Sequence, residues 1–248
     1  MGRWSRQLAP RFVSWLRIGD GAHWLDVGCG TGAMTMAICA NASPASVVGC
    51  DPSEPFVEYA RSEARDPRAS FAVAGVDRLP ERPGGFDSVT SLFAFNFFPE
   101  AGAAILEMRK RTAPGGVVSA CVWDYAGGME FLRRFWDAAV SLDPKARALD
   151  EGRRFPICRP DALTAAFDSG GLAGVRWEPI EIATEFASFD DYWRPMLGGT
   201  GPAPSYVASL EVEQRTELAR RLEAALPRTP NGTIPLTARA WAIRSQNL

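Results

Sequence analysis

Residues 23–38, HWLDVGCGTGAMTMAI, constrain the fold of this chain more than any other stretch. An apolar run of strand length leads into a glycine-rich turn, and an apolar helix follows the turn. Gly28 and Gly30 let the backbone bend tightly and let a ligand approach without interference from a Cβ atom. Dinucleotide phosphates also bind at such turns, so the glycine pattern alone leaves the ligand open.

Two carboxylates near this turn narrow the choice of ligand. Asp26 lies two residues before Gly28, where a fixed negative charge opposes a pyrophosphate and favours a cation. Asp51 closes the second predicted strand, where a carboxylate can accept both hydrogen bonds of a ribose diol. NAD and S-adenosylmethionine (SAM) both contain that diol, but SAM has no phosphate and carries a positive amino group. The two carboxylates therefore favour SAM.

Strands alternate with helices along the first half of the chain, which predicts βαβ units and a parallel sheet. Ligands of such sheets bind beyond the carboxyl ends of the strands. We expect strands at 22–27, 46–51, 70–75, 86–95 and 116–123, and helices at 1–20, 32–41, 53–65 and 103–112, with Ser53 capping its helix and the APGG stretch ending the last one.

The second half is less regular. We expect helices at 160–169 and 211–225 and a strand pair at 174–184 and 236–243. The predicted organisation is one domain plus a cap. Its segments are an N-terminal helix or flap (1–20), the ligand-binding core (21–125), a lid insertion (126–158), a core helix and strand (159–185), a second lid insertion (186–232) and a final core strand (233–248).

Composition excludes several classes of protein. The net charge of −2 gives no reason to expect nucleic acid or an anionic membrane as a partner. The sequence has no apolar run of the roughly 18 residues that a membrane-spanning helix needs. The start of the chain, MGRWSRQLAP, lacks the apolar core of a signal peptide. We therefore predict a cytoplasmic protein with a small-molecule ligand.

The five cysteines argue against a metal site. They stand at 29, 39, 50, 121 and 158, so none forms a C-x-x-C pair, and the chain has a single histidine. We expect no bound metal and predict that the cysteines are small buried side chains. His23 precedes the first strand, roughly 16 Å from the glycine turn at 3.3 Å per residue, so we expect a structural role for it.

Three stretches carry a resemblance to a known family. They are LDVGCGTG (25–32), VVGCDPS (47–53) and FDSVTSLFAFNFFPEAGAAILEMRKRTAPGG (86–116). Over roughly residues 20–125 the chain resembles the class I SAM-dependent methyltransferases, especially the type 11 methyltransferase-domain group. The resemblance implies a Rossmann-like, doubly wound, mostly parallel seven-stranded sheet with helical lid insertions, and SAM as cofactor.

The resemblance also implies roles for individual residues. Asp26, Gly28 and Gly30, with Cys29 between the glycines, would border the methionine part of SAM, and Asp51 would hold the ribose. The remaining contacts would be Pro52 and Phe56 at the adenine and Leu92 or Phe93 at the methionine chain. In addition, Arg3 could bind the methionine carboxylate and Trp4 could shield the sulfonium, although a solvated helix start with one buried tryptophan is the favoured alternative.

One position departs from the family pattern. The family often has an aspartate after the third strand that binds the adenine amino group, and here Gly75 stands in its place. Asp77 could substitute from two residues along, or Val76 could bind adenine through its backbone.

The sequence indicates the residues that bind the methyl acceptor less clearly than those that bind SAM. Residues 190–210 and 231–243 are similar to the C-terminal region of trans-aconitate methyltransferase-like enzymes, which implies a small-molecule acceptor under a cap. Tyr192, Trp193 and Arg194 would suit a planar or anionic acceptor, with packing of Trp193 as the alternative.

Other acceptor candidates follow predicted strands. Trp123, Asp124 and Tyr125 end the fifth strand and should lie near the ligand, although Asp124 could instead cap the next helix. Asn96 is an amide among aromatic residues after the fourth strand, which could bind an acceptor or satisfy local backbone groups.

The sequence therefore predicts a SAM-dependent methyltransferase acting on a small molecule, with O-methylation of an acid or a phenol favoured. Two alternatives stay open: a SAM-fold enzyme with other chemistry, such as aminopropyl transfer or cyclisation, and a non-catalytic SAM-binding protein. A nicotinamide-dependent reductase fits less well because of Asp26.

Overall fold

The computed structural model describes residues 2–198 and 201–248. Backbone contacts divide the chain into two compact units. The first comprises residues 1–122, 159–180 and 240–248, and the second comprises 123–158 and 181–239. Met1 of the predicted N-terminal helix and Gly199 and Thr200 of the predicted second lid insertion lie outside the described residues.

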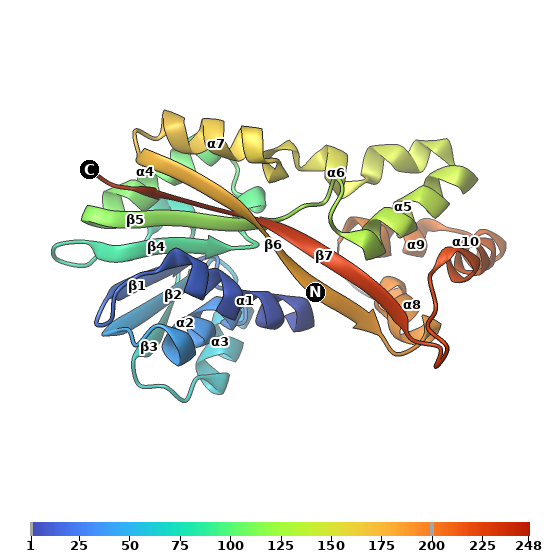
Figure 1. Cartoon of the computed structure of the whole chain (residues 1–248), viewed down its shortest axis with the longest axis horizontal. Helices are drawn as coiled ribbons and strands as arrows, with labels where there is room; N and C mark the ends of the chain where they lie inside the picture. The colour runs from blue at the N-terminus through green and yellow to red at the C-terminus, as the bar shows by residue number, and fades with distance from the viewer. Residues whose placement is uncertain (1, 199–200) are drawn as a thin grey trace. The chain divides into compact units, whose positions relative to one another are not determined.

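A seven-stranded sheet with the order β3-β2-β1-β4-β5-β7-β6 organises the chain (Figure 1). The strands are β1 (His23–Val27), β2 (Ser46–Asp51), β3 (Ala69–Val73), β4 (Phe86–Leu92), β5 (Thr112–Trp123), β6 (Ala173–Phe186) and β7 (Ile234–Gln246). Neighbours from β3 to β5 are parallel. At the other side β7 runs antiparallel to β5, since Gly115 N–H donates to Asn247 O and Asn247 N–H donates to Gly116 O. The predicted fold class is confirmed.

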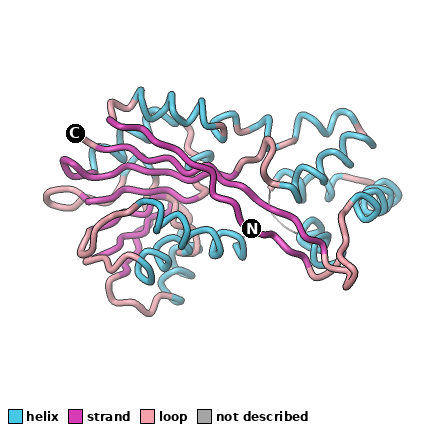
Figure 2. Tube along the Cα trace, in the orientation of Figure 1, coloured by secondary structure: helices cyan, strands magenta, loops and turns pink. Residues whose placement is uncertain are grey.

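Helices connect the strands, as Figure 2 shows in cyan. Those of the first unit are α1 (Gly2–Leu16), α2 (Ala33–Asn41), α3 (Glu54–Glu63), α4 (Ala101–Arg111) and α7 (Pro160–Ser169). Those of the second are α5 (Glu130–Leu142), α6 (Glu151–Arg154), α8 (Phe189–Gly198), α9 (Pro202–Ser209) and α10 (Val212–Ala225). In Figure 1, α4 and α7 lie together, apart from α1, α2 and α3.

Several predicted ends are wrong for local backbone reasons. The first helix ends at Leu16 because Arg17 adopts a left-handed conformation (φ 51°). The fourth strand ends at Leu92 because Phe93 has a φ of 60°. The fifth strand begins at Thr112, directly after α4, and therefore includes the APGG stretch that was predicted as a stop.

The core of the first unit is apolar and closely packed. On α1, a stripe of Leu8, Ala9, Phe12, Val13 and Leu16 is buried, and this helix packs on α2. Fully burying one large side chain of this kind contributes about 1.5–3 kcal/mol. All five cysteines are buried and free, as predicted.

The second unit has its own aromatic core. Phe135, Trp136 and Tyr206 contact one another edge-on or tilted, and the hydroxyl of Tyr192 donates to the carbonyl of Phe131 at 2.7 Å. The indole N–H of Trp136 donates to the buried carboxyl of Glu151. The polar groups of these two buried aromatic side chains therefore have hydrogen-bond partners.

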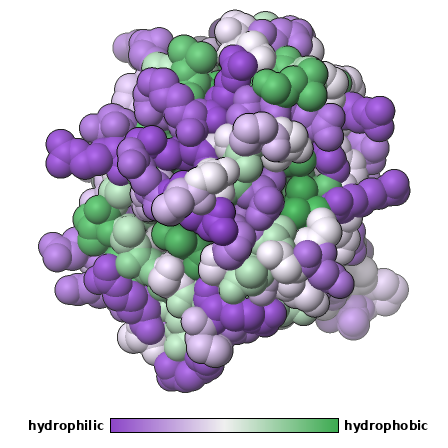
Figure 3. Space-filling model, turned by 90° about the vertical axis from the view of Figure 1, so that its left-hand side faces the viewer, coloured by the Kyte–Doolittle hydropathy of each residue, from purple (hydrophilic) through white to green (hydrophobic). Residues whose placement is uncertain are grey.

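No helix within the described ranges is long and apolar enough to cross a membrane. The face shown in Figure 3 is mostly hydrophilic, and its hydrophobic side chains lie in small groups between hydrophilic ones. Such a mixture is ordinary for side chains exposed to water.

Candidate active site

A pocket of about 250 Å³ lies in the first unit, where β1, β2 and β4 end. Its walls come from three places: the turn 28–31 with the first residues of α2, the loop 92–97 after β4, and the start of α1. Asp51, the last residue of β2, also lines it. The pocket is therefore at the carboxyl ends of the parallel strands, where open α/β sheets bind their ligands.

The glycine turn is held against the end of β2. The amides of Gly28 and Cys29 both donate to the carbonyl of Cys50, at 2.8 and 2.9 Å. Gly28 has a φ of 75°, and a Cβ atom there would lie 2.3 Å from the Cβ of Ala94. Gly30 has a φ of 53°, but a Cβ there would meet no atom within 4 Å. The first glycine permits close packing, and the second leaves space in the pocket.

Asp51 connects the turn to the start of α3. Its Oδ2 accepts the amide of Gly30 at 3.0 Å, and its Oδ1 accepts the amide of Ser53 at 2.9 Å. A carboxylate has about four acceptor positions, so two remain for a ligand. The expected side-chain cap by Ser53 is absent from the described α3 terminus, and its amide contact to Asp51 stands instead.

Asp26 lies beneath the turn rather than on the pocket wall. It is completely buried, and the hydroxyl of Thr35 donates to its Oδ2 at 2.7 Å. Its Oδ1 has no hydrogen-bond partner among the described residues. Burial raises the pKa of the Asp26 carboxyl to about 7, and the bonds from Thr35 oppose that shift. A nearby cation would stabilise the ionised form of this side chain.

The loop after β4 forms an apolar wall. Leu92, Phe93, Ala94 and Phe97 line the pocket, and the positive φ of Phe93 turns the chain there. Within this loop Asn96 is 7% exposed, and neither its Oδ1 nor its Nδ2 has a hydrogen-bond partner among the described residues. A buried amide in this state is costly unless a ligand or water satisfies it.

The start of α1 contributes residues that the sequence analysis missed. Gly2, Ser5 and Arg6 line the pocket, whereas Arg3 and Trp4 do not, and the Arg3 guanidinium lies 4.3 Å from the Trp4 ring centroid. The helical periodicity of this segment indicates which of its first residues share a face with the buried stripe of α1. Counting back three or four residues from the buried Ala9 gives positions 6 and 5, and another step gives position 2.

The residues predicted at the adenine lie outside this pocket lining. Phe56 is 51% exposed on the first turn of α3, next to the exposed Pro52. Val76 and Asp77 form a 3₁₀ turn after β3. A Cβ at Gly75 would lie 2.6 Å from Asp77 Oδ1, so this glycine lets the Asp77 carboxylate fold back.

The residues predicted at the end of the fifth strand belong to the second unit. The Oδ2 of Asp124 accepts two hydrogen bonds from Arg239, at 2.7 and 2.9 Å, and its Oδ1 accepts the amide of Gly127. Asp124 does not cap the next helix, since α5 begins at Glu130. Trp123 and Tyr125 are buried, and burial raises the pKa of the Tyr125 hydroxyl well above 10, so it stays protonated at neutral pH.

The predicted acceptor residues on α8 have different environments. Tyr192 is buried and bonded to Phe131 O. Trp193 stacks on Phe189, with ring centroids 6.1 Å apart. Arg194 is exposed and pairs with Asp190. These contacts stay within the second unit.

His23 has the structural contacts expected of it. Its amide donates to Asp87 Oδ2 at 2.7 Å, and its Nδ1 lies 2.7 Å from Ser46 Oγ. Both partners stand near the start of their strands, away from the strand ends that form the pocket.

Comparison with known proteins gives the pocket a context. Residues 25–116 match the family model described as a methyltransferase domain. This stretch of the chain is therefore similar to methyltransferase domains. This range includes the glycine turn, Asp51 and the loop after β4.

Individual relatives support this assignment. The chain is 37% identical over 94 residues to demethylmenaquinone methyltransferase of Thermus thermophilus, covering 37% of this chain and 43% of that protein. It is 33% identical over 127 residues to the human probable tRNA methyltransferase 9B, covering 50% of this chain and 25% of that protein. The chain thus spans less than half the length of these relatives.

The fold likeness extends further than the sequence likeness. A putative methyltransferase from Bacillus halodurans superposes with a TM-score of 0.62 at 14% identity, covering 96% of this chain and 98% of that one. At this identity the likeness shows the fold alone. The matched family model ends at residue 116, so the resemblance of the predicted cap to trans-aconitate methyltransferase-like enzymes stays a prediction.

Proposed function

We propose that this protein transfers a methyl group from SAM to a small organic acceptor, as an O-methyltransferase of a carboxylic acid or a phenol. The observation that carries the proposal is the pocket at the strand ends, in which Asp51 presents a carboxylate beside an open glycine turn within a methyltransferase domain. The name of the Thermus relative, which refers to demethylmenaquinone, supports a small-molecule acceptor.

The pocket offers groups that fit SAM. Asp51 retains acceptor positions for the two hydroxyls of a ribose. The guanidinium of Arg6 suits the methionine carboxylate, and Leu92 and Phe93 supply an apolar wall for the methionine chain. Beneath the turn, the unpartnered Oδ1 of Asp26 supplies negative potential near a cationic ligand. Pro52, Phe56, Val76 and Asp77 remain proposed contacts of the adenine.

SAM supplies a methyl group on a sulfonium, which is an activated leaving group, so the protein mainly aligns the acceptor and excludes water. The titratable residues lining the pocket are Arg6, Cys29 and Asp51. Burial raises the pKa of the Cys29 thiol far above 9, so it stays protonated, and Asp51 already accepts two backbone hydrogen bonds. An acceptor that is already anionic, such as a carboxylate, would need no general base.

Asn96 is the side chain we assign to the acceptor. Its neighbours Ala94 and Phe97 line the pocket, and its amide offers both an acceptor and a donor without partners among the described residues. A hydroxyl or a carboxylate oxygen would satisfy it. Asp124 and Tyr125 we assign to structure, because the first is held by Arg239 and the second stays protonated.

The test has a binding arm and a turnover arm. Calorimetry should show SAM and its demethylated product binding, and Asp51→Ala should weaken SAM binding by about 1–3 kcal/mol through loss of charge-assisted hydrogen bonds. Glu58→Ala, which removes an exposed acid on the same unit, is the control. NAD binding without SAM binding would overturn the cofactor assignment.

The turnover arm uses methyl-labelled SAM with separate panels of carboxylic acids, phenols, quinones and tRNA. Label transfer to an acid or a phenol that falls with Asn96→Ala supports the proposal. Transfer to tRNA alone would replace the small-molecule acceptor. SAM binding with no label transfer to any panel would favour a non-catalytic or cyclising protein.

A further inference from the structure

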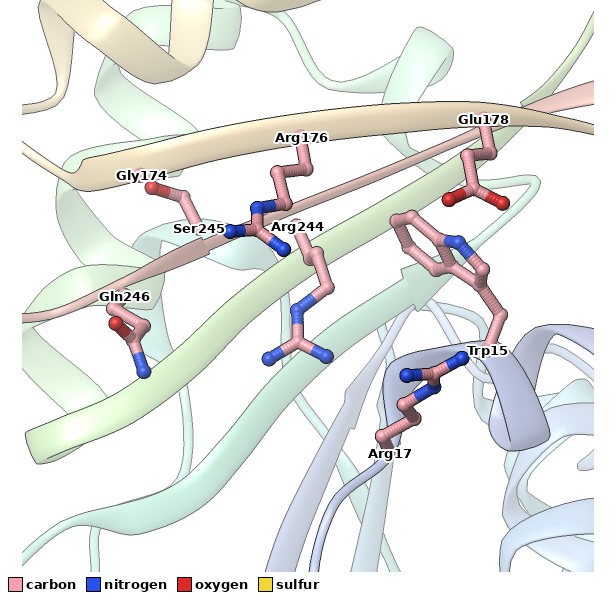
Figure 4. A pocket seen from close by; sticks show the side chains of 8 residues that line it. All are labelled: Trp15, Arg17, Gly174, Arg176, Glu178, Arg244, Ser245 and Gln246. Carbon is pink, nitrogen blue, oxygen red and sulfur yellow. The ribbon is translucent and has the colours of Figure 1, made fainter.

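A second cavity in the first unit has a volume of about 450 Å³. The end of α1 provides Trp15 and Arg17, β6 provides Arg176 and Glu178, and β7 provides Arg244 and Gln246 (Figure 4). Three arginines and a single glutamate therefore face one cavity.

This cavity lies at the opposite edge of the sheet from the candidate active site. Residues 115 and 116, at the start of β5, pair with residue 247 just after β7. Arg244 and Gln246 therefore stand where the parallel strands begin, whereas the candidate active site stands where they end. A ligand of this cavity would not compete with SAM for the same residues.

The positive charges are not neutralised within the fold. Neither Arg17 nor Arg176 forms an ion pair within residues 2–198 and 201–248, and no carboxylate of this range, Glu178 included, lies within ion-pair distance of Arg244. Nη1 of Arg244 donates to the carbonyl of Leu16. Burial lowers the pKa of Arg244, and the charges of Arg176 and Arg17 lower it further, so the guanidiniums are close enough to repel one another.

The backbone at the end of α1 places one of these cations. Arg17 has a φ of 51°, in the left-handed region that residues other than glycine seldom adopt. Such strain is common at ligand sites. In Figure 4 the half-buried indole of Trp15 lies between Glu178 and Arg17, so a flat apolar surface adjoins the charged groups.

We propose that this cavity binds a small phosphomonoester, with the phosphate on Arg17, Arg176 and Arg244 and the organic part against Trp15. Guanidinium groups match phosphate oxygens in a bidentate fashion, and a dianion offsets three clustered cations better than a single carboxylate does. Glu178 and Gln246 at the margin offer acceptors to hydroxyl groups of the organic part. The proposal does not depend on the reaction that the domain catalyses.

Calorimetric titrations at constant ionic strength test this site with AMP, ribose 5-phosphate, inorganic phosphate and acetate as probes. We expect the two phosphomonoesters to bind more tightly than inorganic phosphate, and acetate not to compete. Equal binding of acetate, or of inorganic phosphate and the esters, would overturn the assignment.

Variants locate the binding. Arg176→Gln, an exposed position on β6, should weaken phosphomonoester binding at least about tenfold. Arg17→Asn should act in the same way, because asparagine tolerates the left-handed backbone. Arg65→Gln, which removes an exposed arginine elsewhere on this unit, should leave binding unchanged. Unchanged binding in Arg176→Gln and Arg17→Asn, with melting temperature and SAM affinity preserved, would refute the site.

Discussion

At the scale of single residues, α1 distinguishes two neighbouring arginines. Arg6 lines the pocket, whereas Arg3 stacks on Trp4. We expect Arg6→Gln to weaken SAM binding by about 1–2 kcal/mol, because it removes charge-assisted hydrogen bonds to the methionine carboxylate, while Arg3→Gln has no such effect. Calorimetry with decarboxylated SAM provides the control. If Arg6→Gln weakens that analogue equally, Arg6 does not bind the carboxylate.

The burial of Asp26 leads to a prediction of how the stability of the protein depends on pH. Its carboxyl has a pKa of about 7 in the folded protein, against about 3.9 in an unfolded chain. Between these values the native state binds the additional proton, so the stabilisation from this group is fully present below about pH 4 and is lost as pH rises through 7. The free energy of unfolding of the unsubstituted protein, minus that of the Asp26→Asn variant, should fall by roughly 3–4 kcal/mol from pH 4 to 8.

Denaturant titrations of both proteins at several pH values measure this difference. The other titrating groups cancel in it, since the amide side chain of the Asp26→Asn variant keeps an acceptor for the hydroxyl of Thr35. Parallel stability curves for the two proteins would show that the pKa of Asp26 is the same in the folded and unfolded states.

At the scale of elements, the glycine turn explains how much the sequence could reveal. Its residues are close in sequence to the strand that carries them, so the pattern of strand, glycines and helix predicted the pocket at residues 28–30. The end of the fourth strand and the end of the first helix were predicted less well, because Phe93 and Arg17 adopt left-handed backbones that no local propensity requires. The Asp124–Arg239 pair joins residues 115 positions apart, and a single sequence gives no signal for such a pair.

The fit of this turn against the loop after β4 can be measured with matched glycines. Gly28 and Gly21 both have a φ of 75°, but a Cβ would meet Ala94 at 2.3 Å in the first case and no atom within 4 Å in the second. Gly21→Ala should therefore cost only backbone strain, about 1–2 kcal/mol. Gly28→Ala should cost a further 1–3 kcal/mol or so from overpacking.

Thermal or denaturant unfolding measures both costs, and a second substitution isolates the overlap. Ala94→Gly removes the atom that the new Cβ would meet, so Gly28→Ala with Ala94→Gly should recover much of the additional loss. Equal losses of stability in Gly21→Ala and Gly28→Ala would mean that the loop after β4 moves away from the new Cβ atom without an energetic cost.

At the scale of the whole molecule, α1 links the two cavities of the first unit. Ser5 and Arg6 line the candidate active site, and Trp15 lines the second cavity, the one that holds the three arginines. Ten residues separate Ser5 from Trp15, which is about 15 Å along a helix. The buried stripe between them fixes the helix on α2. A ligand at one end therefore orders an element that the ligand at the other end also needs.

We expect this shared helix to couple the two sites positively. A phosphomonoester that holds Trp15 and Arg17 reduces the ordering cost that SAM otherwise meets at the start of α1, so saturating AMP should tighten SAM binding by about fivefold. Because coupling in binding is reciprocal, saturating SAM must tighten AMP binding by the same factor. Arg176 stands on β6 and lines the second cavity but not the candidate active site, so Arg176→Gln should abolish the effect by removing AMP. Equal SAM affinities with and without AMP, in a protein that binds both, would show that α1 transmits nothing between the sites.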